Sequence, residues 1–201
     1  IQAYAENNQE ALDLALMAYA VAEDPAVLTP FMVNLDGFAL THTYETVDVP
    51  AEEDADAFLP PYQATNCFDF EHPKNIGYSA GPDYNRYFKY YEHRDMLGAF
   101  EAIDRVEARF AECFGRAYTG PIEAMNCDDA EVVLVTLGSI AGLARESVAR
   151  LRKQGKRVGL LRIRYMRPFP AKLIAEALSG ATAVGVLEKD ISFGAEGTVF
   201  T

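Results

Sequence analysis

The residues best suited to acid–base chemistry lie close together in the first quarter of the chain. His42 lies between Asp36 and Glu45, so an imidazole and two carboxylates share one short segment. A histidine beside carboxylates can exchange protons near neutral pH. No serine or cysteine has an evident partner for nucleophilic attack, and His72 and His93 have no metal-ligand spacing with His42. The alternative is a histidine at the surface or at a domain interface.

Two further clusters directly follow strand-like sequence. Gly138 and Ser139 precede an amphipathic stretch, where free backbone amides could hold a phosphate or a carboxylate. The phosphate-binding patterns GxGxxG and GxxxxGK[ST] are absent from the sequence, so a tight turn with Ser139 as a helix N-cap is the alternative. Glu188, Lys189 and Asp190 follow another apolar run. They could form a site at the carboxyl edge of a sheet, or a hydrogen-bonded interface.

A run of basic residues spans positions 150 to 167. Its first members lie near a predicted helix end, where positive charge complements the helix dipole. Arg162 and Arg164 alternate with Ile163, so we expect them to face carboxylates or a partner. A coenzyme A phosphate is a further candidate for these two arginines.

The cysteines indicate neither a metal cluster nor disulfide bonds. Cys67, Cys113 and Cys127 are far apart, and no CxxC pair occurs. Iron–sulfur clusters and structural zinc usually take four ligands with close pairs, so we expect neither. An odd number of cysteines, with no visible signal sequence, suggests reduced thiols in the cytoplasm. No apolar run reaches the ~18 residues that span a bilayer, so we expect no membrane partner.

Charge is unevenly distributed along the 201 residues, whose formal net charge is −12. Residues 1–73 contain 14 Asp and Glu but no Lys or Arg, and all 18 basic residues lie from Lys74 onward. An acidic half of this kind would repel phosphates, so we expect no nucleic acid partner. It could face a basic partner or form a solvated acidic surface.

The elements that would position these residues are clearest in the second half. Three apolar runs predict strands, at 131–137, 157–163 and 182–187. Helical spacing predicts helices at 97–114, 140–155 and 170–178. This alternation of strands and helices predicts an α/β fold with a mostly parallel sheet and flanking helices.

The first part of the chain predicts fewer elements. Asn7 and Glu10 have capping-box spacing at the start of a helix over 8–23, and a short buried strand follows at 31–35. Prolines interrupt residues 41–96 repeatedly, which indicates an irregular connector or extended arm. The aromatic residues of this segment need a surface to pack against.

Blocks of sequence resemble the α subunit of 2-oxoacid:ferredoxin oxidoreductases, most closely the pyruvate enzymes. They are ENNQEALDLALMAYAVAED at 6–24, VNLDGFALTHTYETVDVP at 33–50, FLPPY at 58–62, GPDY at 81–84, LGSIAGLARESVARLRKQGKRVGLLRIRYMRPFP at 137–170 and LEKDISFGAEG at 187–197. The blocks span nearly the whole chain in the family's order, and this combination is specific although no single block is.

The resemblance implies three regions. Residues 1–48 are similar to the C-terminal end of a thiamine-pyrimidine-binding domain, 49–96 to a connector or extended arm, and 97–201 to the Rossmann-like, three-layer C-terminal domain of transketolases. The glutamate that activates thiamine, the diphosphate and magnesium motif and the cluster cysteines have no counterpart here. We therefore carry over no catalytic or metal-binding residue.

Six residues remain as candidates near a domain interface, without an assigned cofactor contact. They are Asp36, Gly37, Thr41, His42, Gly138 and Ser139.

The resemblance also implies a multi-subunit, cytoplasmic enzyme that converts pyruvate to acetyl-CoA and reduces ferredoxin. The complex would use thiamine diphosphate, magnesium, iron–sulfur clusters and coenzyme A, with β, γ and δ subunits as partners. We expect this chain to form structure and subunit contacts, to bind none of these cofactors alone and to be inactive alone. One alternative is the same role in a 2-ketoisovalerate or other 2-oxoacid enzyme. The other is a non-catalytic assembly module whose acidic arm binds a basic neighbour.

Overall fold

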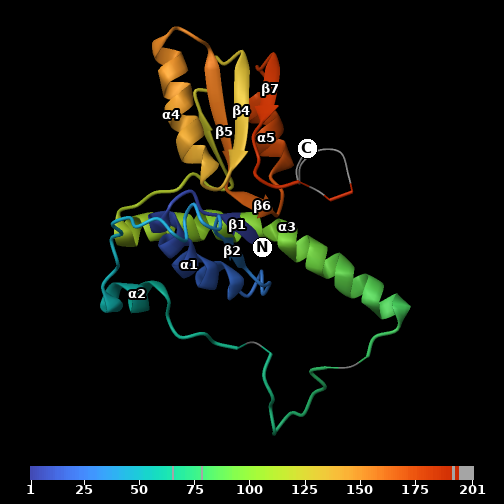
Figure 1. Cartoon of the computed structure of the whole chain (residues 1–201). Coiled ribbons are helices and arrows are strands. Elements are labelled where there is room, and N and C mark those ends of the chain that lie inside the picture. The colour runs from blue at the N-terminus through green and yellow to red at the C-terminus, as the bar shows by residue number, and fades with distance from the viewer. Residues whose placement is uncertain (65, 78, 192, 195–201) are drawn as a thin grey trace.

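A computed structural model describes residues 1–64, 66–77, 79–191 and 193–194. The described residues form a three-stranded sheet and a four-stranded sheet, with the long helix α3 (Pro82–Phe114) lying across the junction between them (Figure 1). This is a mixed α/β fold. No helix in the described part of the chain is long and apolar enough to cross a membrane.

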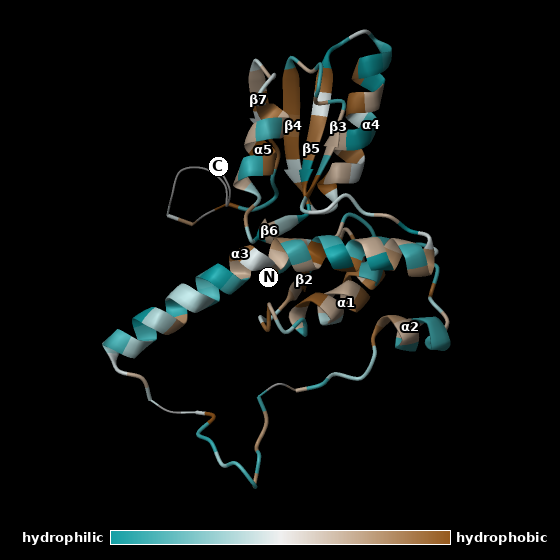
Figure 2. Cartoon of the chain, turned by 180° about the vertical axis from the view of Figure 1, so that it is seen from behind, coloured by the Kyte–Doolittle hydropathy of each residue, from teal (hydrophilic) through white to brown (hydrophobic). Residues whose placement is uncertain are grey.

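The four-stranded sheet has the order β3-β5-β4-β7. Its strands are β3 (Ile122–Met125), β4 (Val132–Leu137), β5 (Val158–Ile163) and β7 (Ala183–Val186). The central strand β4 runs parallel to both β5 and β7, whereas β3 pairs antiparallel with β5 at one edge. The predicted mostly parallel arrangement is therefore confirmed. The strands are rich in hydrophobic residues, as Figure 2 shows.

Helices α4 (Ile140–Lys153) and α5 (Ala171–Leu178) cover opposite faces of this sheet. Alternate residues of β4 point to opposite faces of the sheet. Val133 and Val135 belong to the apolar cluster that contacts α5. Leu134 belongs to the cluster that contains Ala144 and Val148 of α4. The sheet and its helices thus form three layers.

The order of this sheet creates a switch point. The chain passes from β4 through α4 to β5 on one side and then returns past β4 to β7 on the other. The carboxyl ends of β4 and β7 are therefore neighbours. The helices that connect the parallel strands, α4 and α5, lie on opposite faces of the sheet. Figure 1 shows that this edge faces the three-stranded sheet. In open α/β sheets, this is the usual place for a functional site.

The three-stranded sheet has the order β2-β1-β6. Its strands are β1 (Gln2–Tyr4), β2 (Met32–Asn34) and β6 (Tyr165–Arg167), with β1 parallel to β2 and antiparallel to β6. Helix α1 (Asn8–Ala22) packs between this sheet and α3. Because β6 directly follows β5 in sequence, one continuous segment contributes strands to both sheets.

Two predictions about the middle of the chain are wrong. The segment 41–96, predicted to be irregular, contains α2 (Glu52–Phe58) and the first half of α3. The helix α3 starts at Pro82 rather than at 97, because proline fits the first helical position, where no intrahelical N–H bond is needed. Strand β2 is also more exposed than the predicted buried strand. Residues 195–201 of the predicted third region, and with them the end of the 187–197 block, lie outside the described residues.

Candidate functional site

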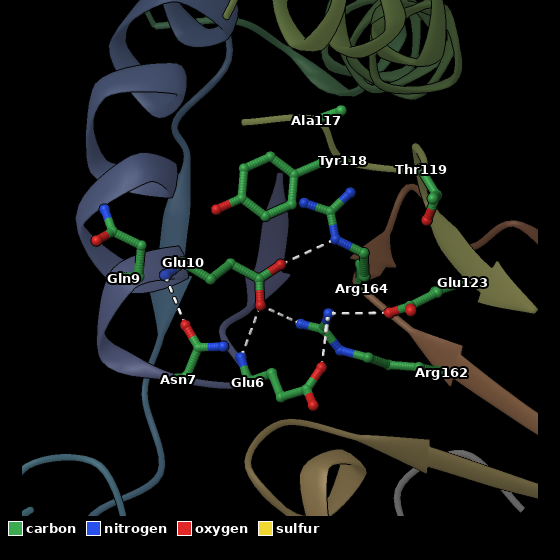
Figure 3. A pocket seen from close by; sticks show the side chains of 10 residues that line it. All are labelled: Glu6, Asn7, Gln9, Glu10, Ala117, Tyr118, Thr119, Glu123, Arg162 and Arg164. Carbon is green, nitrogen blue, oxygen red and sulfur yellow. Dashed lines mark hydrogen bonds and ion pairs between the residues drawn. The ribbon is translucent and has the colours of Figure 1, made fainter. Parts of the chain in front are cut away.

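A polar pocket of about 260 Å³ lies between the start of α1 and strand β5 (Figure 3). It is lined by Glu6, Asn7, Gln9, Glu10, Ala117, Tyr118, Thr119, Glu123, Arg162 and Arg164. Figure 3 shows the carboxylates of Glu6 and Glu10, at the start of α1, pointing toward the guanidinium groups of Arg162 and Arg164. The pocket therefore lies where the two sheets meet.

The first turn of α1 is held by its own capping contacts. The side chain of Asn7 accepts a hydrogen bond from the Glu10 backbone N–H at 2.9 Å, as its spacing predicts. The Glu10 carboxylate accepts one from the Glu6 backbone N–H at 2.8 Å. Glu10 is only 2% exposed, and the positive end of the helix dipole favours its charge.

Glu10 meets both arginines of the β5 segment. Its Oε1 accepts a hydrogen bond from Arg164 Nε at 2.9 Å, and its Oε2 forms an ion pair with Arg162. Arg162 also lies 3.2 Å from the Glu6 carboxylate and 3.5 Å from that of Glu123. The prediction that Arg162 and Arg164 face carboxylates is thus confirmed.

Arg164 extends the network to α3. Its Nη1 donates to Glu107 Oε1 at 2.7 Å and to the Gly120 carbonyl at 2.5 Å. Its guanidinium lies 4.6 Å from the centre of the Tyr118 ring. Burial alone would lower the pKa of Arg164, but the charges of Glu107 and Glu10 outweigh it and raise that pKa, so Arg164 stays charged.

A second buried carboxylate on α1 extends the network to the segment that follows α3. Asp13 is fully buried and accepts hydrogen bonds from Arg116 Nε and Nη2, both at 2.8 Å. The hydroxyl of Tyr118 also donates to Asp13, at 2.7 Å. Burial, with the hydrogen bond to Asp13, raises the pKa of Tyr118, so this phenol remains a neutral donor.

The network holds elements together, because its charged groups are already bonded to one another. Both carboxylate oxygens of Glu10 and both of Asp13 are occupied by partners, so these two carboxylates hold the surrounding elements in place. From its spacing, Glu10 is predicted only as a capping residue, and no pattern in the sequence points to Asp13. The available signal was two carboxylates three positions apart in a helix rich in alanine and leucine.

Another cluster lies at the switch point of the four-stranded sheet. Asp36 Oδ2 accepts a hydrogen bond from the Ser139 backbone N–H at 2.6 Å and lies 3.2 Å from Lys189 Nζ. Lys189 Nζ also donates to Ser139 Oγ at 2.7 Å. Gly138 has a φ of 66°, and a Cβ there would lie 3.0 Å from Asp36 Oδ2. Three of the six predicted interface residues, Asp36, Gly138 and Ser139, are therefore in contact.

This cluster corrects the predicted role of Ser139. Ser139 precedes α4, but its side chain makes no capping hydrogen bond. Asp36, in the loop after β2, instead places its carboxylate at the start of α4. Burial alone would raise the pKa of Asp36, but hydrogen bonds from Ser139 and Lys189 outweigh it and lower that pKa.

The other predicted interface residues lie on an exposed loop. Gly37, Thr41 and His42 are exposed, and the His42 ring stacks on Phe38 with 4.7 Å between ring centres. Thr41 Oγ1 lies 3.0 Å from His42 Nδ1.

The predicted acid–base cluster does not form. Glu45 accepts a hydrogen bond from the Asn8 backbone N–H at 2.9 Å, and Asp36 binds Ser139 and Lys189. His42 is exposed, which agrees with the alternative of a histidine at the surface or at a domain interface.

The described residues offer no donor set for the magnesium and iron–sulfur clusters that the resemblance implies. No group of three or more His, Cys, Asp or Glu among the described residues could hold a metal ion. Cys67, Cys113 and Cys127 are free thiols, with only Cys127 buried. The buried carboxylates of α1 are paired with arginines, so neither is available to a thiamine ring. We derive no catalytic step through these groups.

Comparisons with known proteins identify two regions. Residues 1–108 match the family "Pyruvate flavodoxin/ferredoxin oxidoreductase, thiamine diP-bdg", and residues 130–201 match "Pyruvate:ferredoxin oxidoreductase core domain II". The chain is 45% identical over 201 residues to pyruvate synthase subunit PorA of Methanothermobacter thermautotrophicus, covering 100% of this chain and 52% of that protein. It is 44% identical to PorA of Pyrococcus abyssi, covering 100% of this chain and 51% of the relative.

Other relatives carry a different substrate in their names. The ketoisovalerate oxidoreductase subunit VorA of Pyrococcus abyssi is 42% identical, covering 100% of this chain and 51% of that protein. The chain spans about half the length of these curated relatives.

A solved structure supports the fold. It is the 2-oxoglutarate:ferredoxin oxidoreductase of Magnetococcus marinus, with 2-oxoglutarate, coenzyme A and succinyl-CoA bound. It is similar at a TM-score of 0.63 and 16% identity, covering 96% of this chain and 35% of that chain. The two family regions, matched in order along one chain, show that this protein belongs to the pyruvate:ferredoxin oxidoreductase family.

Proposed function

We propose that this chain is part of the α subunit of an enzyme that oxidises pyruvate to acetyl-CoA and reduces ferredoxin. The observation that carries this proposal is the 45% identity to a pyruvate synthase subunit over the whole chain. The complex would use thiamine diphosphate, magnesium, iron–sulfur clusters and coenzyme A. Its β, γ and δ subunits would be partners of this chain in the cytoplasm.

Within that complex, the chain supports the active site rather than performing the chemistry. It joins the end of a pyrimidine-binding domain at 1–48, through a connector at 49–96, to a transketolase C-terminal-like domain at 97–201. The three-layer arrangement around β4 supports the third assignment. The loop that carries Asp36, Gly37, Thr41 and His42 is anchored to the carboxyl edge of this sheet, which supports a place at the domain interface.

A chimera tests this proposal. This chain replaces the matching half of PorA from Methanothermobacter thermautotrophicus, and the product is purified with that enzyme's other subunits. We expect pyruvate-dependent, coenzyme A-dependent reduction of ferredoxin. The isolated chain, given thiamine diphosphate and magnesium, should release no carbon dioxide from pyruvate. A chimera that assembles but does not turn over pyruvate would contradict the proposal, as would decarboxylation by the isolated chain.

The 42% identity to a VorA subunit favours a second candidate, the same role in a 2-ketoisovalerate enzyme. Rates with pyruvate and with 2-ketoisovalerate, measured on the native complex, separate the two. Faster turnover of the branched substrate would replace the first candidate with the second.

A further inference from the structure

Asp36 and Gly37, in the loop after β2, form the one Asp-Gly pair in the sequence. In such a pair, the backbone nitrogen of the second residue can attack the side-chain carboxyl group of the first, because glycine has no Cβ to block the approach. Gly37 is exposed, and a Cβ there would meet nothing within 4 Å. The pair therefore has the residue types and the open space that this rearrangement needs.

The rearrangement needs no co-reactant except water. The Gly37 nitrogen forms a bond to Asp36 Cγ, and the carboxyl hydroxyl leaves as water together with the proton of that nitrogen. The product is a cyclic succinimide. Water then opens the ring at either carbonyl, which returns aspartate or leaves isoaspartate, in which the main chain runs through the side-chain carbons.

Contacts with the four-stranded sheet oppose this reaction. Asp36 Oδ2 accepts a hydrogen bond from the Ser139 backbone N–H at 2.6 Å and lies 3.2 Å from Lys189 Nζ. We call these two contacts the tether. Attack by Gly37 turns the carboxylate into a neutral ring carbonyl, which gives up the ion pair with Lys189. The reaction is therefore favoured only while the tether is open.

Two further features slow the attack. The Asp36 carbonyl accepts a hydrogen bond from the backbone N–H of the buried Leu40 at 3.1 Å, which restrains the peptide plane that joins Asp36 to Gly37. Burial alone would raise the pKa of Asp36, but hydrogen bonds from Ser139 and Lys189 outweigh it and lower that pKa. An ionised carboxylate is a poorer electrophile than a carboxylic acid.

We propose that Asp36 is the residue at which this chain forms isoaspartate, and that the tether keeps the reaction slow while the fold is intact. Isoaspartate adds one carbon to the main chain and removes one from the side chain. Its carboxylate cannot reach Ser139 and Lys189 from the same position, so each event breaks the tether. Asp36 belongs to the matched region 1–108 and its partners to 130–201, so the modification removes a contact between the two.

Ageing of the full chain at neutral pH, below its unfolding temperature, tests this proposal. Cleavage after glutamate releases the peptide 24–45. Asp36 is its one reactive aspartate, because Asp24 precedes Pro25, whose nitrogen carries no hydrogen. Electron-transfer fragmentation distinguishes isoaspartate from aspartate. The synthetic peptide 24–45 is the unfolded reference, and the folded chain should react at least about tenfold more slowly, because its carboxylate is hydrogen-bonded.

Three variants separate the site from its protection. Lys189→Met removes one partner of the tether and should raise the rate about two- to fivefold. Its matched control is Lys172→Met, which removes a lysine that is 89% exposed and pairs with Glu176, and the rate should not change. Gly37→Ala should nearly abolish isoaspartate, because the methyl group hinders the attack. Gly37 does not adopt a positive φ, so this variant keeps the fold, which circular dichroism checks.

Equal rates in the folded chain and in the peptide would overturn protection by the tether, as would an unchanged rate in Lys189→Met. Isoaspartate that arises first at another aspartate, or undiminished in Gly37→Ala, would overturn the assignment of the site, as would its absence from the aged peptide. The comparison of chain and peptide needs no substitution, so it tests the proposal even where a variant does not fold. None of these measurements depends on the proposed enzymatic function.

Discussion

Arg164→Met tests whether the buried ion-pair network holds the two sheets together. The Arg164 side chain is 2% exposed, and it bonds to Glu10 at 2.9 Å and to Glu107 at 2.7 Å. Methionine occupies much of the same volume, so packing loss is limited. The variant instead leaves two buried carboxylates without one of their partners.

The expected loss in the free energy of unfolding follows from these two carboxylates that lack a partner. A hydrogen bond to a charged group contributes about 1.5–3 kcal/mol, and Arg164 makes three hydrogen bonds. The full sum overstates the loss, because Glu10 retains its ion pair with Arg162. Removing one partner from a buried pair costs about 3–5 kcal/mol in the free energy of unfolding, and we expect a value in that range.

Urea unfolding monitored by circular dichroism measures this loss. With a slope of about 2–3 kcal/mol per molar urea, the midpoint should fall by roughly 1–2 M. Arg150→Met is the control, since Arg150 is 73% exposed and pairs with Glu146 one helical turn away. That pair contributes about 0.3–0.5 kcal/mol, so the control midpoint should hardly move. A loss below about 1 kcal/mol for Arg164→Met would refute the idea of a network that clamps the sheets.

Three further substitutions test the strand-end contacts. Gly138→Ala should lower the free energy of unfolding, measured by thermal unfolding, by about 1–3 kcal/mol, because φ is positive and the added methyl group meets Asp36. Gly155→Ala also places alanine at a positive φ, but in open space, and should lower it by only about 1 kcal/mol. Equal losses in the two variants would contradict a close contact between Gly138 and Asp36. Asp36→Asn should lower stability above about pH 5, and the difference from the unmodified chain should vanish as pH falls. The pKa of Asp36 is lower in the folded chain than its ordinary value of 3.8. The ionised carboxylate therefore stabilises the fold above pH 3.8, and this stabilisation is lost as pH falls through the folded-state pKa. A difference that does not shrink as pH falls below 3.8 would count against this. Gly159→Ala places a Cβ 2.8 Å from the Asn126 carbonyl oxygen and should lower the free energy of unfolding by about 2–3 kcal/mol. A smaller loss would mean that β5 shifts to make room, and faster amide exchange in β5 would show that shift.

The four-stranded sheet could be predicted because its signals are local. Strands β4, β5 and β7 were expected within one or two residues of their observed ends, since each is a dense apolar run between turn residues. Strands β1, β3 and β6 were missed, because three or four residues are too few to show a period of two. Their positions are set by pairing with distant segments.

The first half of α3 was missed for a different reason. Prolines around it indicated broken structure, and its tyrosines have lower helix propensity than alanine or leucine. Pro82 nevertheless starts the helix, and the helix continues from a second half whose apolar face is buried. Extension of an existing helix avoids the cost of a new nucleus.

The strand-end cluster shows what spacing alone cannot reveal. Ser139 and Lys189 are candidates because they follow predicted strands, and Asp36 because it lies near His42. Their contacts span 103 and 153 residues, so only the folded chain shows that they form one cluster. Arg162 and Arg164 were expected to face carboxylates, but their partners could not be named.

The uneven charge of the sequence is partly balanced within the fold. Acidic residues from the base-free first 73 positions pair with basic residues from the remainder: Glu6 with Arg145, Glu10 with Arg164, Asp13 with Arg116, Asp24 with Arg105, Asp36 with Lys189 and Asp48 with Arg116. An acidic half therefore does not by itself require a basic partner. Several of these pairs join the region matched to the thiamine-binding family to the region matched to core domain II. Since the buried pairs resist screening by salt, the two regions should keep their relative position while solvent-exposed subunit contacts form and break.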